Sequence, residues 1–348
     1  MPIGADLVLH EEPDTESVRN HGDALGRVIE RTAARWKTPL AIPLMDLRLE
    51  KTDLLARIGV TRKDAEAFHF TSPLDETTFA ALSGGDACPA CPGSLARDRA
   101  LAYIAAIPGL LPIGMAIGPF SLVTRLMADP ITAAAMAGRG VSADDSDEVR
   151  LLLQCLQIAE AAVARSIRGQ AAHGARAIMI CEPAANTSFL SPRQLRAGSS
   201  IFERLVMEPN LRLNSILEEC GCDLIFHDCG ELIDAMVEGF AHRLHPVILS
   251  LGSSRKLWED ARLVPADVVL YGNLPTKSFY SDGAMPVEEV TRRAQELLAK
   301  MKACRHPHIL GSECDVLFVP EAREAILKKV DAMMAVTDRP VPRGQAEG

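Results

Sequence analysis

Three side chains of the kinds that bind zinc occur at two places that lie far apart in the sequence. His227 and Cys229 belong to the segment His227-Asp228-Cys229-Gly230, and Cys314 belongs to Glu313-Cys314-Asp315-Val316. One imidazole and two thiolates are ligands that zinc prefers, and three protein ligands leave a fourth position open, as in catalytic zinc sites. The residue types therefore predict a catalytic zinc site. The spacing alone leaves two alternatives open, an accidental H-x-C pattern and a structural zinc.

Each half of this motif follows an apolar run that is typical of a buried strand. Further runs of the same kind recur along the chain, with longer amphipathic segments between them, and this alternation favours parallel strands connected by helices. The predicted strands are Pro39–Met45, Ala67–Thr71, Leu111–Ile117, Ala175–Cys181, Cys222–Phe226, Pro246–Leu251, Asp267–Tyr271 and Pro307–Leu310.

The clearest predicted helix begins after Ser146, a good N-cap residue, and ends before Gly174. Its first turn carries Asp147 and Glu148, which interact favourably with the N-terminal end of a helix. Its apolar residues recur at helical spacing. The other predicted helices are Pro192–Glu219, Glu231–His242, Pro286–Cys304 and Pro320–Ala335.

Eight strands alternating with helices predict an α/β fold, a (β/α)8 TIM barrel. We assign the barrel to residues 37–337, an N-terminal extension to residues 1–36 and a disordered tail to residues 338–348. A doubly wound open sheet is the alternative, but it normally carries a glycine-rich phosphate-binding turn, and this sequence has none. Barrel chemistry occurs at the C-terminal ends of the strands. The three zinc-binding residues are therefore expected to meet there.

Four other polar residues are expected near the same ends of the strands. Asp46 follows the first predicted strand, His69 lies in the second, Glu182 follows the fourth and Asn273 follows the seventh. We predict that Glu182 and Asn273 take part in catalysis. For Glu182 the alternative is an exposed loop acid or a helix cap, and for His69 it is a hydrogen-bonded wall residue. Asp228 and Asp315 flank the zinc-binding residues and either orient them or are solvated.

The remaining cysteines are not expected to act in the chemistry. The chain has nine scattered cysteines, which in a long chain without a secretory signal do not suggest a disulfide framework. Cys155 and Cys304 are interpreted as structural. Cys220 and Cys222 precede the fifth predicted strand, at the end away from the site. Cys88-Pro89-Ala90-Cys91 lacks the second cysteine pair of a zinc site and a thioredoxin-like setting.

Composition narrows the class of protein. The chain has 348 residues, of which 48% are hydrophobic and 24% charged, as in ordinary globular proteins. Its formal net charge of −9 argues against a nucleic-acid-binding surface. No apolar stretch is long enough for a membrane helix, and the N-terminus lacks the apolar region of a secretory signal. We therefore expect a cytoplasmic protein.

Five ordered segments resemble the uroporphyrinogen decarboxylase superfamily, and within it the zinc-dependent corrinoid methyltransferases, such as the methylcobalamin:coenzyme M methyltransferases. The resemblance covers about residues 118–335 and implies a TIM barrel with zinc on His227, Cys229 and Cys314. It also implies methyl transfer between a corrinoid and a small substrate, with cobalamin supplied by a separate corrinoid protein. The matching segments are Gly118-Pro119-Phe120-Ser121-Leu122, Leu190-Ser191-Pro192, His227-Asp228-Cys229-Gly230, Gly272-Asn273 and Glu313-Cys314-Asp315-Val316.

Two departures from known patterns refine this prediction. The decarboxylases of the superfamily carry an Arg-Gln-Ala-Gly-Arg-type motif, whereas the corresponding region here is Arg31-Thr32-Ala33-Ala34-Arg35-Trp36. The D-x-H-x-x-G motif of a cobalamin-binding chain is also missing. A metal-free decarboxylase and a non-enzymatic corrinoid-protein accessory factor are the alternatives. Candidate methyl donors or acceptors are a thiol, a methoxylated aromatic, a methyl halide and a methylated sulfur compound, and the ligand set favours the thiol.

Overall fold

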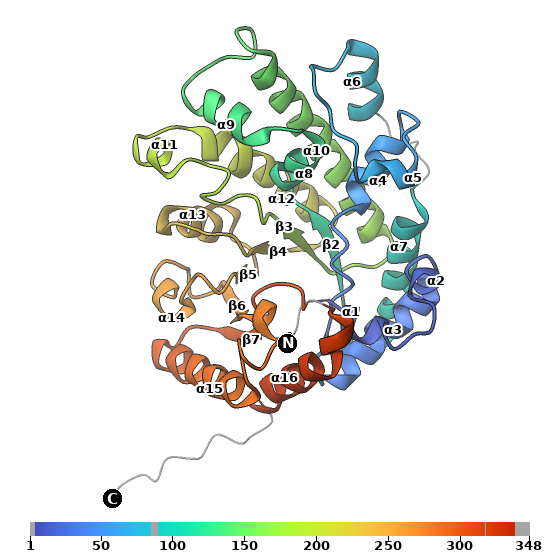
Figure 1. Ribbon diagram of the computed structural model, residues 1–348, viewed down its shortest axis with the longest axis vertical. Coiled ribbons are helices and arrows are strands. Elements are labelled where there is room, and N and C mark those ends of the chain that lie inside the picture. Colours follow the sequence, from blue (N-terminus) through green and yellow to red (C-terminus); the bar gives the residue numbers. More distant parts are fainter. Residues whose placement is uncertain (1–3, 85–89, 317, 338–348) are drawn as a thin grey trace, which may run out of the picture.

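The computed structural model describes residues 4–84, 90–316 and 318–337, and its strands form one parallel sheet (Figure 1). The sheet has seven strands that follow one another in chain order, from β1 to β7. A doubly wound sheet reverses its strand order at a switch point. The order found here is instead the sequential order of a barrel. The strands are β1 Leu40–Ala41, β2 Leu111–Ile117, β3 Ala177–Cys181, β4 Asp223–Asp228, β5 Ile248–Leu251, β6 Val269–Leu274 and β7 His308–Ser312.

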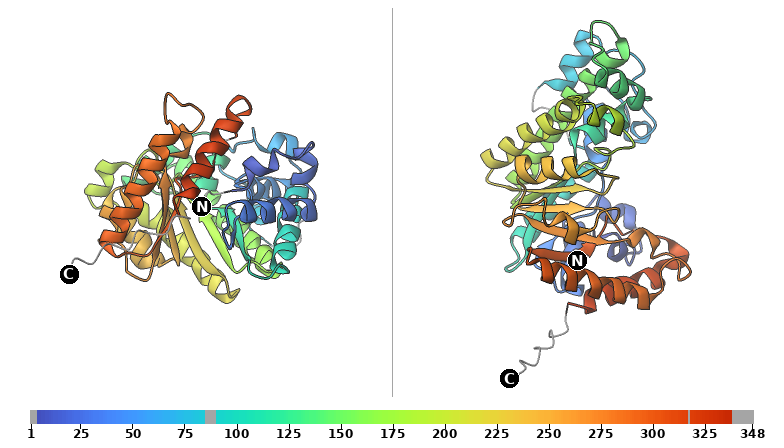
Figure 2. Two further views of the ribbon diagram at one scale, coloured as in Figure 1. Left: turned by 90° about the horizontal axis from the view of Figure 1, so that it is seen from below. Right: turned by 90° about the vertical axis from the view of Figure 1, so that its left-hand side faces the viewer.

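The sheet is curved like half of a barrel, and helices cover its outer face (Figures 1 and 2). Parallel strands covered on both faces are apolar throughout, and β3 is buried along its whole length. The outer helices, which run antiparallel to the strands or cross between them, are α10 Asp147–Ala172, α12 Glu208–Glu219, α13 Asp234–Gly239, α14 Leu257–Asp260 and α15 Val287–Cys304.

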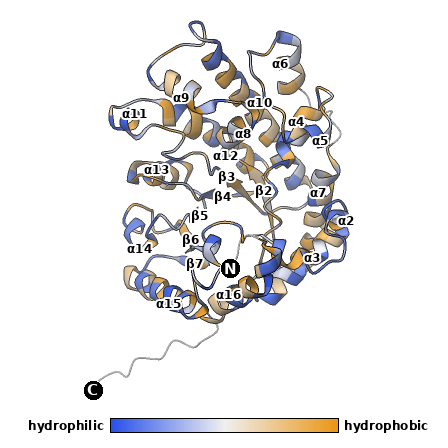
Figure 3. Cartoon of the chain, in the orientation of Figure 1, coloured by the Kyte–Doolittle hydropathy of each residue, from blue (hydrophilic) through white to orange (hydrophobic). Residues whose placement is uncertain are grey.

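The two faces of the sheet pack into separate apolar clusters because side chains alternate along a strand. The outer face and the helices form the large cluster, whereas the inner face forms a small one. Figure 3 shows that apolar and polar residues alternate along α15, as expected of a helix with one face on the sheet. The buried inner residues are Ile42, Ile113, Met115, Ala177, Met179, Cys181, Ile225 and Tyr271.

The predicted count of eight strands is wrong by one, because residues 67–71 do not form a strand of the sheet. β1 pairs directly with β2, which leaves no place between them. Phe70 instead forms a single bridge with Met127, at the end of α8 (Pro119–Leu126), and its ring packs edge-on against Phe68. Because β1 occupies the edge beside β2, the run 67–71 has no strand to pair with and packs Phe70 against the end of α8 instead.

The seven strands of the sheet confirm the other seven predictions for their positions, with small shifts at the ends. Leu111–Ile117 matches exactly, while the first strand is shorter than predicted because Pro43, soon after Ala41, has no N–H for a ladder. The helix predicted after Ser146 is α10, and the Ser146 hydroxyl accepts a hydrogen bond from the Val149 N–H. Both ends of this helix follow the expected capping chemistry.

The single helix predicted over Pro192–Glu219 is wrong, because the chain breaks after its first turn. α11 covers Pro192–Arg196 and ends before Gly198, which has a φ of +81°. Glycine adopts this left-handed conformation without steric cost, so it ends a helix readily. The chain then resumes through a π-helical segment, η1 (Glu203–Met207), into α12.

Residues before β1 form three helices that pack beside the open side of the sheet. α1 (Asp6–Leu9) is buried on three of its four residues, and α3 (Gly22–Arg35) packs against α7 (Pro92–Ala105).

The predicted boundary between an extension and a barrel domain stays a prediction, and the predicted tail 338–348 lies outside the described residues. Other elements are α2 Thr15–Arg19, α4 Leu49–Ala56, α5 Arg62–Ala65, α6 Glu76–Ser83, α9 Pro130–Gly138, η2 Phe240–Leu244, η3 Thr276–Ser278, η4 Pro320–Ala322 and α16 Arg323–Ala335.

Within the described ranges, none of the helices is both long enough and apolar enough to cross a membrane.

Candidate metal centre

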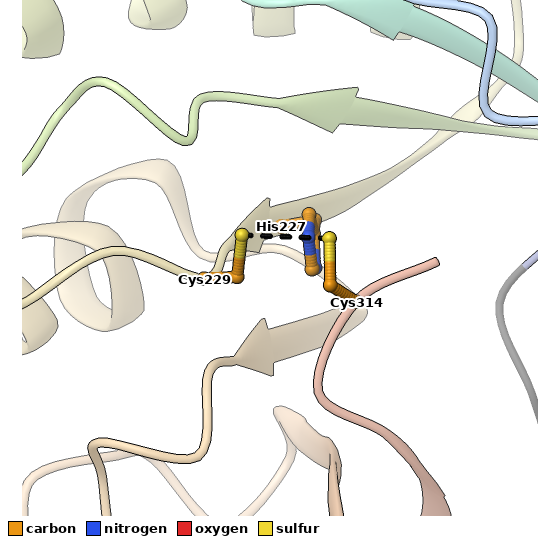
Figure 4. Close-up of side chains that lie close together, drawn as sticks. All are labelled: His227, Cys229 and Cys314. Carbon is orange, nitrogen blue, oxygen red and sulfur yellow. Dashed lines mark hydrogen bonds between the residues drawn. The ribbon is translucent and has the colours of Figure 1, made fainter. Parts of the chain in front are cut away.

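His227, Cys229 and Cys314 converge at the C-terminal ends of β4 and β7 (Figure 4). His227 is near the end of β4, Cys229 directly follows this strand, and Cys314 lies two residues beyond β7. One ligand atom from each residue lies within 4.8 Å of the other two. In the part of the chain that the structure describes, no other group of three His, Cys, Asp or Glu side chains meets this condition. The fold thus joins the two distant halves of the motif.

One ring nitrogen of His227 has a hydrogen-bond partner and the other has none. Its Nδ1 lies 2.8 Å from the hydroxyl oxygen of Ser250, the residue next to it in the ladder between β4 and β5. Nε2 is buried and has no hydrogen-bond partner. A histidine whose Nδ1–H donates to a neighbour presents a lone pair at Nε2, which is the usual arrangement of a metal-binding histidine.

The two sulfur atoms are in direct contact. Sγ of Cys229 donates a hydrogen bond to Sγ of Cys314 over 3.5 Å. This bond, helped by the nearby His227 imidazole, lowers the pKa of Cys314, although burial opposes the shift. The same bond, together with burial, raises the pKa of Cys229. The contact therefore favours the thiolate form at Cys314, which is the form of cysteine that binds metal.

These atoms fit a zinc ion by several independent criteria. With Zn–S bonds of about 2.3 Å, two sulfur ligands of a tetrahedral ion lie about 3.8 Å apart, close to the 3.5 Å found here. The unpartnered Nε2 of His227 supplies the third donor. A buried polar atom without a partner is costly, so its presence beside two thiols supports a bound cation. Two sulfurs and one nitrogen are also the donor types that zinc prefers.

The carboxyl groups next to the ligands in sequence are buried. Asp228 Oδ1 accepts a hydrogen bond from the Gly230 N–H at 2.8 Å, and its Oδ2 has no partner. Asp315 Oδ1 is also buried without a partner. Burial holds the pKa of both carboxyl groups well above the usual range. Asp228 is fully buried and therefore not solvated, whereas Asp315 as a whole is partly exposed. A role of either residue in supporting the three candidate ligands stays a prediction.

Close backbone packing fixes the position of Cys229. A Cβ atom placed on Gly252, just after β5, would lie 2.6 Å from the carbonyl oxygen of Cys229. Real Cβ atoms do not approach this closely, so only glycine fits here. On the other side of the site, the thioether sulfur of Met45 lies 4.0 Å from Sγ of Cys314. The loop after β1 therefore reaches the metal-binding atoms.

Glu313 links the Cys314 loop to two neighbouring loops. Its Oε2 accepts hydrogen bonds from the N–H and the hydroxyl of Ser253, and its Oε1 accepts one from the Lys277 N–H at 3.4 Å. The Glu313 N–H in turn donates to the Leu274 carbonyl at the end of β6. These bonds hold the loops after β5, β6 and β7 together, and they position Cys314.

Glu182 is a buried helix cap and not an exposed acid. Its carboxylate accepts hydrogen bonds from the N–H groups of Phe120 and Ser121, at 3.1 and 2.8 Å, in the first turn of α8. The side-chain amide of Asn210 donates a third, at 3.0 Å. Burial raises the pKa of Glu182, although the three hydrogen bonds act in the opposite direction and lower it. Gly118 leaves room for it, since a Cβ there would lie 2.0 Å from the carboxyl carbon of Glu182.

Asn273 is likewise occupied by backbone groups. Its side-chain amide donates to the carbonyl oxygens of Gly252 at 2.7 Å and Arg255 at 2.9 Å. It therefore shapes the loop after β5, which contains the Gly252 that packs against Cys229. The catalytic roles expected of Glu182 and Asn273 stay predictions, and their contacts favour a positioning role for both.

Asp46 and His69 do not join the three ligands. Asp46 is largely buried after β1, and although burial opposes it, the bidentate pair with Arg48 lowers the pKa of Asp46. The placement of His69 in a strand is wrong, because this residue is exposed and outside the sheet. Its Nδ1 lies 3.0 Å from the Ala67 carbonyl oxygen, within its own loop.

Four of the other cysteines lie apart from the metal-binding atoms, whereas Cys181 pairs with His227 in the ladder between β3 and β4. Cys155 is fully buried on α10, and burial raises the pKa of its thiol to about 12. Cys304 is exposed at the end of α15 and donates to the Trp258 carbonyl. Cys220 and Cys222 precede β4, at the opposite end of that strand from His227. Cys88 of the Cys-x-x-Cys segment lies outside the described residues.

Sequence analysis missed three residues that the structure places around the site. These are Ser250, which contacts His227, Asn210, which contacts Glu182, and Met45, which contacts Cys314. A signal existed for Ser250, because it is the one polar residue of an otherwise apolar strand. Asn210 lies within an ordinary amphipathic helix and Met45 within a loop. Neither position shows a pattern that points to the site.

Comparisons with known proteins identify the fold and the family of this chain. The structure resembles that of a methyltransferase from Methanosarcina mazei, with a TM-score of 0.66 and 16% sequence identity, over 97% of this chain and 91% of that one. At this identity the likeness shows a shared fold. No curated protein matched the sequence. The family model for uroporphyrinogen decarboxylase (URO-D) matches residues 103–338, about two-thirds of the chain. The protein therefore belongs to the uroporphyrinogen decarboxylase family.

Proposed function

We propose that this protein is a zinc-dependent methyltransferase that moves a methyl group between a corrinoid and a small substrate. The convergence of His227 Nε2, Cys229 Sγ and Cys314 Sγ within 4.8 Å carries the proposal. Membership of the family and the fold shared with the Methanosarcina mazei methyltransferase support it. We also infer that the sequential half-barrel sheet is a variant of the (β/α)8 barrel.

His227, Cys229 and Cys314 would form a zinc site that suits an electron-rich sulfur atom of a substrate. A zinc ion bound here would keep a substrate thiol deprotonated or act as a Lewis acid on a leaving group. Ser250 orients His227, and Cys229 and Cys314 together contribute two negative charges that balance a dication. A substrate thiolate would then make the centre anionic overall, which favours its attack on a methyl group.

The surroundings of the three ligands suit a methyl group better than a porphyrin. The inner face of the sheet is lined by aliphatic and thioether side chains, such as Met115, Met179 and Ile225. Two buried carboxyl groups, Asp228 and Asp315, flank the ligands. A substrate with many carboxylates requires paired cations, because buried charges without partners are costly. The metal-free decarboxylase is therefore the less supported alternative.

We propose a separate corrinoid protein as the partner that presents the methyl group. The chain itself lacks the D-x-H-x-x-G motif, and the three candidate ligands lie at the C-terminal ends of the strands, where barrel enzymes bind their substrates. The proposed substrate is a small thiol.

Metal content tests the proposal directly. Purified protein should contain about one zinc per chain by plasma mass spectrometry, and Cys314→Ala should contain little. Cys304→Ala is the matched control, because this exposed cysteine is on α15 and should leave the zinc unchanged. Absence of zinc in the unmodified protein, even after zinc is added back, would contradict the mechanism.

A second experiment separates a catalytic from a structural zinc. When a thiol is added to the zinc-containing protein, X-ray absorption spectra should show one more sulfur in the zinc coordination shell, which a structural zinc would not show.

A further inference from the structure

The two sulfur ligands lie unusually close together for residues from separate strands. Sγ of Cys229 and Sγ of Cys314 are 3.5 Å apart, while the residues themselves follow β4 and β7. We propose that Cys229 and Cys314 form a reversible disulfide when the site holds no metal, so that peroxide and zinc compete for the same two sulfur atoms. The competition with zinc rests on the proposed function, whereas the formation of the disulfide does not.

The side chains of both cysteines can rotate to close the remaining gap. A disulfide bond is about 2.05 Å long, so the sulfurs must approach by about 1.5 Å from their separation of 3.5 Å. Gly252 fixes the backbone of Cys229 and the hydrogen bonds of Glu313 hold the loop of Cys314, so rotation about the two Cα–Cβ bonds supplies most of this movement. Both cysteines lie just beyond their strands, where this rotation breaks no ladder hydrogen bond.

The pair is selective for this reaction. Among the cysteines within the described ranges, Cys229 and Cys314 are the only two whose sulfur atoms form a hydrogen bond with each other. Cys181 ends β3 in the interior of the sheet and is fully buried, and Cys304 is exposed on α15. Cys229 and Cys314 are both partly exposed, so a small oxidant can reach them.

The reaction balances with hydrogen peroxide as the two-electron oxidant. The thiolate of Cys314 attacks one peroxide oxygen, the O–O bond breaks, and a sulfenic acid and hydroxide form. The sulfur of Cys229 then attacks the sulfenic sulfur, giving the S–S bond and a second hydroxide. The proton of Cys229 and one from solvent convert both hydroxides to water. Two electrons leave the pair of sulfurs and reduce one peroxide, and a dithiol reductant reverses the change.

The disulfide would remove both anionic ligands at once. A disulfide sulfur carries no charge and is a poor zinc ligand, because the thiolate is the form that binds metal. Only His227 would remain, and one imidazole does not hold zinc. Bound zinc should in turn protect the pair, because it occupies the sulfur lone pairs that attack the oxidant. Oxidation would therefore switch off metal loading without damage to the fold.

Peptide mapping of the metal-free protein tests the inference. Zinc is stripped with a chelator, one equivalent of hydrogen peroxide is added, and the protein is digested with trypsin without reduction. Cys314 is the only cysteine in the tryptic peptide 306–323, and Cys229 shares the peptide 213–243 with Cys220 and Cys222. We expect a cross-link between these peptides, the loss of two free thiols and a mass lower by two hydrogens. All three should reverse with dithiothreitol.

Matched variants identify the cysteines in the cross-link. Cys229→Ser and Cys314→Ser should each abolish it, while Cys220→Ser, Cys222→Ser and Cys304→Ser should retain it. After oxidation, zinc added back should remain near zero per chain until the reductant is added. Stable addition of oxygen atoms to Cys314 without a cross-link would overturn the inference. So would a cross-link that persists in Cys229→Ser.

The result separates this inference from the proposed function. A protein that forms the cross-link but never binds zinc contradicts the proposed function alone. A protein that binds zinc but does not form the cross-link after zinc removal contradicts the inference alone.

Discussion

His227 and Ser250 are neighbours in the ladder between β4 and β5, and the hydroxyl of Ser250 lies 2.8 Å from Nδ1 of His227. In parallel strands, paired residues in register point to the same side of the sheet. The strand pairing itself therefore brings this hydroxyl to the imidazole. When Nδ1–H donates to this hydroxyl, the lone pair of Nε2 faces the two sulfur atoms. The sheet thus orients His227 towards Cys229 and Cys314, which the loops after β4 and β7 supply.

Replacement of Ser250 by Ala should weaken zinc binding without unfolding the protein. The variant removes the partner of Nδ1, so the imidazole can rotate and change tautomer. Loss of such a partner typically lowers metal affinity by about 10- to 100-fold. Competition with a coloured chelator measures the change. Ser250→Thr keeps the hydroxyl and is the control. An unchanged zinc affinity in Ser250→Ala would show that the hydroxyl does not orient His227.

Replacement of Glu182 by Gln should destabilise the protein although it removes a buried charge. Both carboxylate oxygens accept hydrogen bonds, from Phe120, Ser121 and Asn210. The amide NH2 of glutamine would face one of these donors, and a buried unsatisfied donor costs about 1–3 kcal/mol. Urea unfolding measures the loss. Glu238→Gln, at an exposed position of α13, should change stability by less than about 0.5 kcal/mol. Equal effects of the two variants would contradict the capping role.

His308 should make the stability fall as the pH is lowered. Burial at the start of β7 lowers the pKa of its imidazole from 6.5 to about 4, while the neutral ring donates to the Gly272 carbonyl. Between these two values the unfolded chain binds more protons than the folded one, so the free energy of unfolding decreases from pH 6.5 towards pH 4. The decrease reaches about 3 kcal/mol at most, at 1.4 kcal/mol per pKa unit.

The variant His308→Gln isolates this contribution. Glutamine can donate to the same carbonyl but does not titrate. Urea unfolding at pH 7 and pH 4.5 should give a smaller difference for the variant than for the unmodified protein. The same pH dependence in both proteins would mean that protons bound elsewhere cause it.

Local patterns in the sequence were sufficient to predict most of the sheet and the convergence of three candidate ligands. Leu111–Ile117 could be predicted exactly because it is apolar and flanked by helical segments. His227, Cys229 and Cys314 could be placed together because each follows an apolar run, and the ends of parallel strands meet at one edge. Both inferences need only the alternation of strands and helices.

Long-range contacts explain what local patterns missed. Residues 67–71 look like a strand, but their place in the sheet is taken by the direct pairing of β1 with β2. Glu182 follows a strand end, as an active-site acid would, yet its environment is set by α8, which begins more than 60 residues earlier. The role of Ser250 depends on its register with His227. None of these relationships can be obtained from one segment alone.

Replacement of Gly252 by Ala should displace Cys229 and lower zinc affinity more than it lowers stability. The added methyl group would lie 2.6 Å from the Cys229 carbonyl oxygen and 2.9 Å from its Cα, so the backbone of one loop has to move. Because Asn273 holds the Gly252 carbonyl at 2.7 Å, the loop after β5 resists this movement. We therefore expect the Cys229 loop to shift, which takes one sulfur out of the geometry that zinc requires.

Gly283→Ala is the matched control for this steric effect. A methyl group on Gly283 meets only the Ser281 hydroxyl, at an ordinary contact distance of 3.5 Å. Its zinc affinity should equal that of the unmodified protein, while Gly252→Ala should bind zinc at least about tenfold more weakly, as expected when the support of one ligand is disturbed. Unfolding in urea shows whether the fold is intact. If Gly252→Ala keeps full zinc affinity, Cys229 is either not held by this contact or not a ligand. Zinc content of Cys229→Ser then decides between the two, because loss of zinc in that variant identifies Cys229 as a ligand that tolerates the shift.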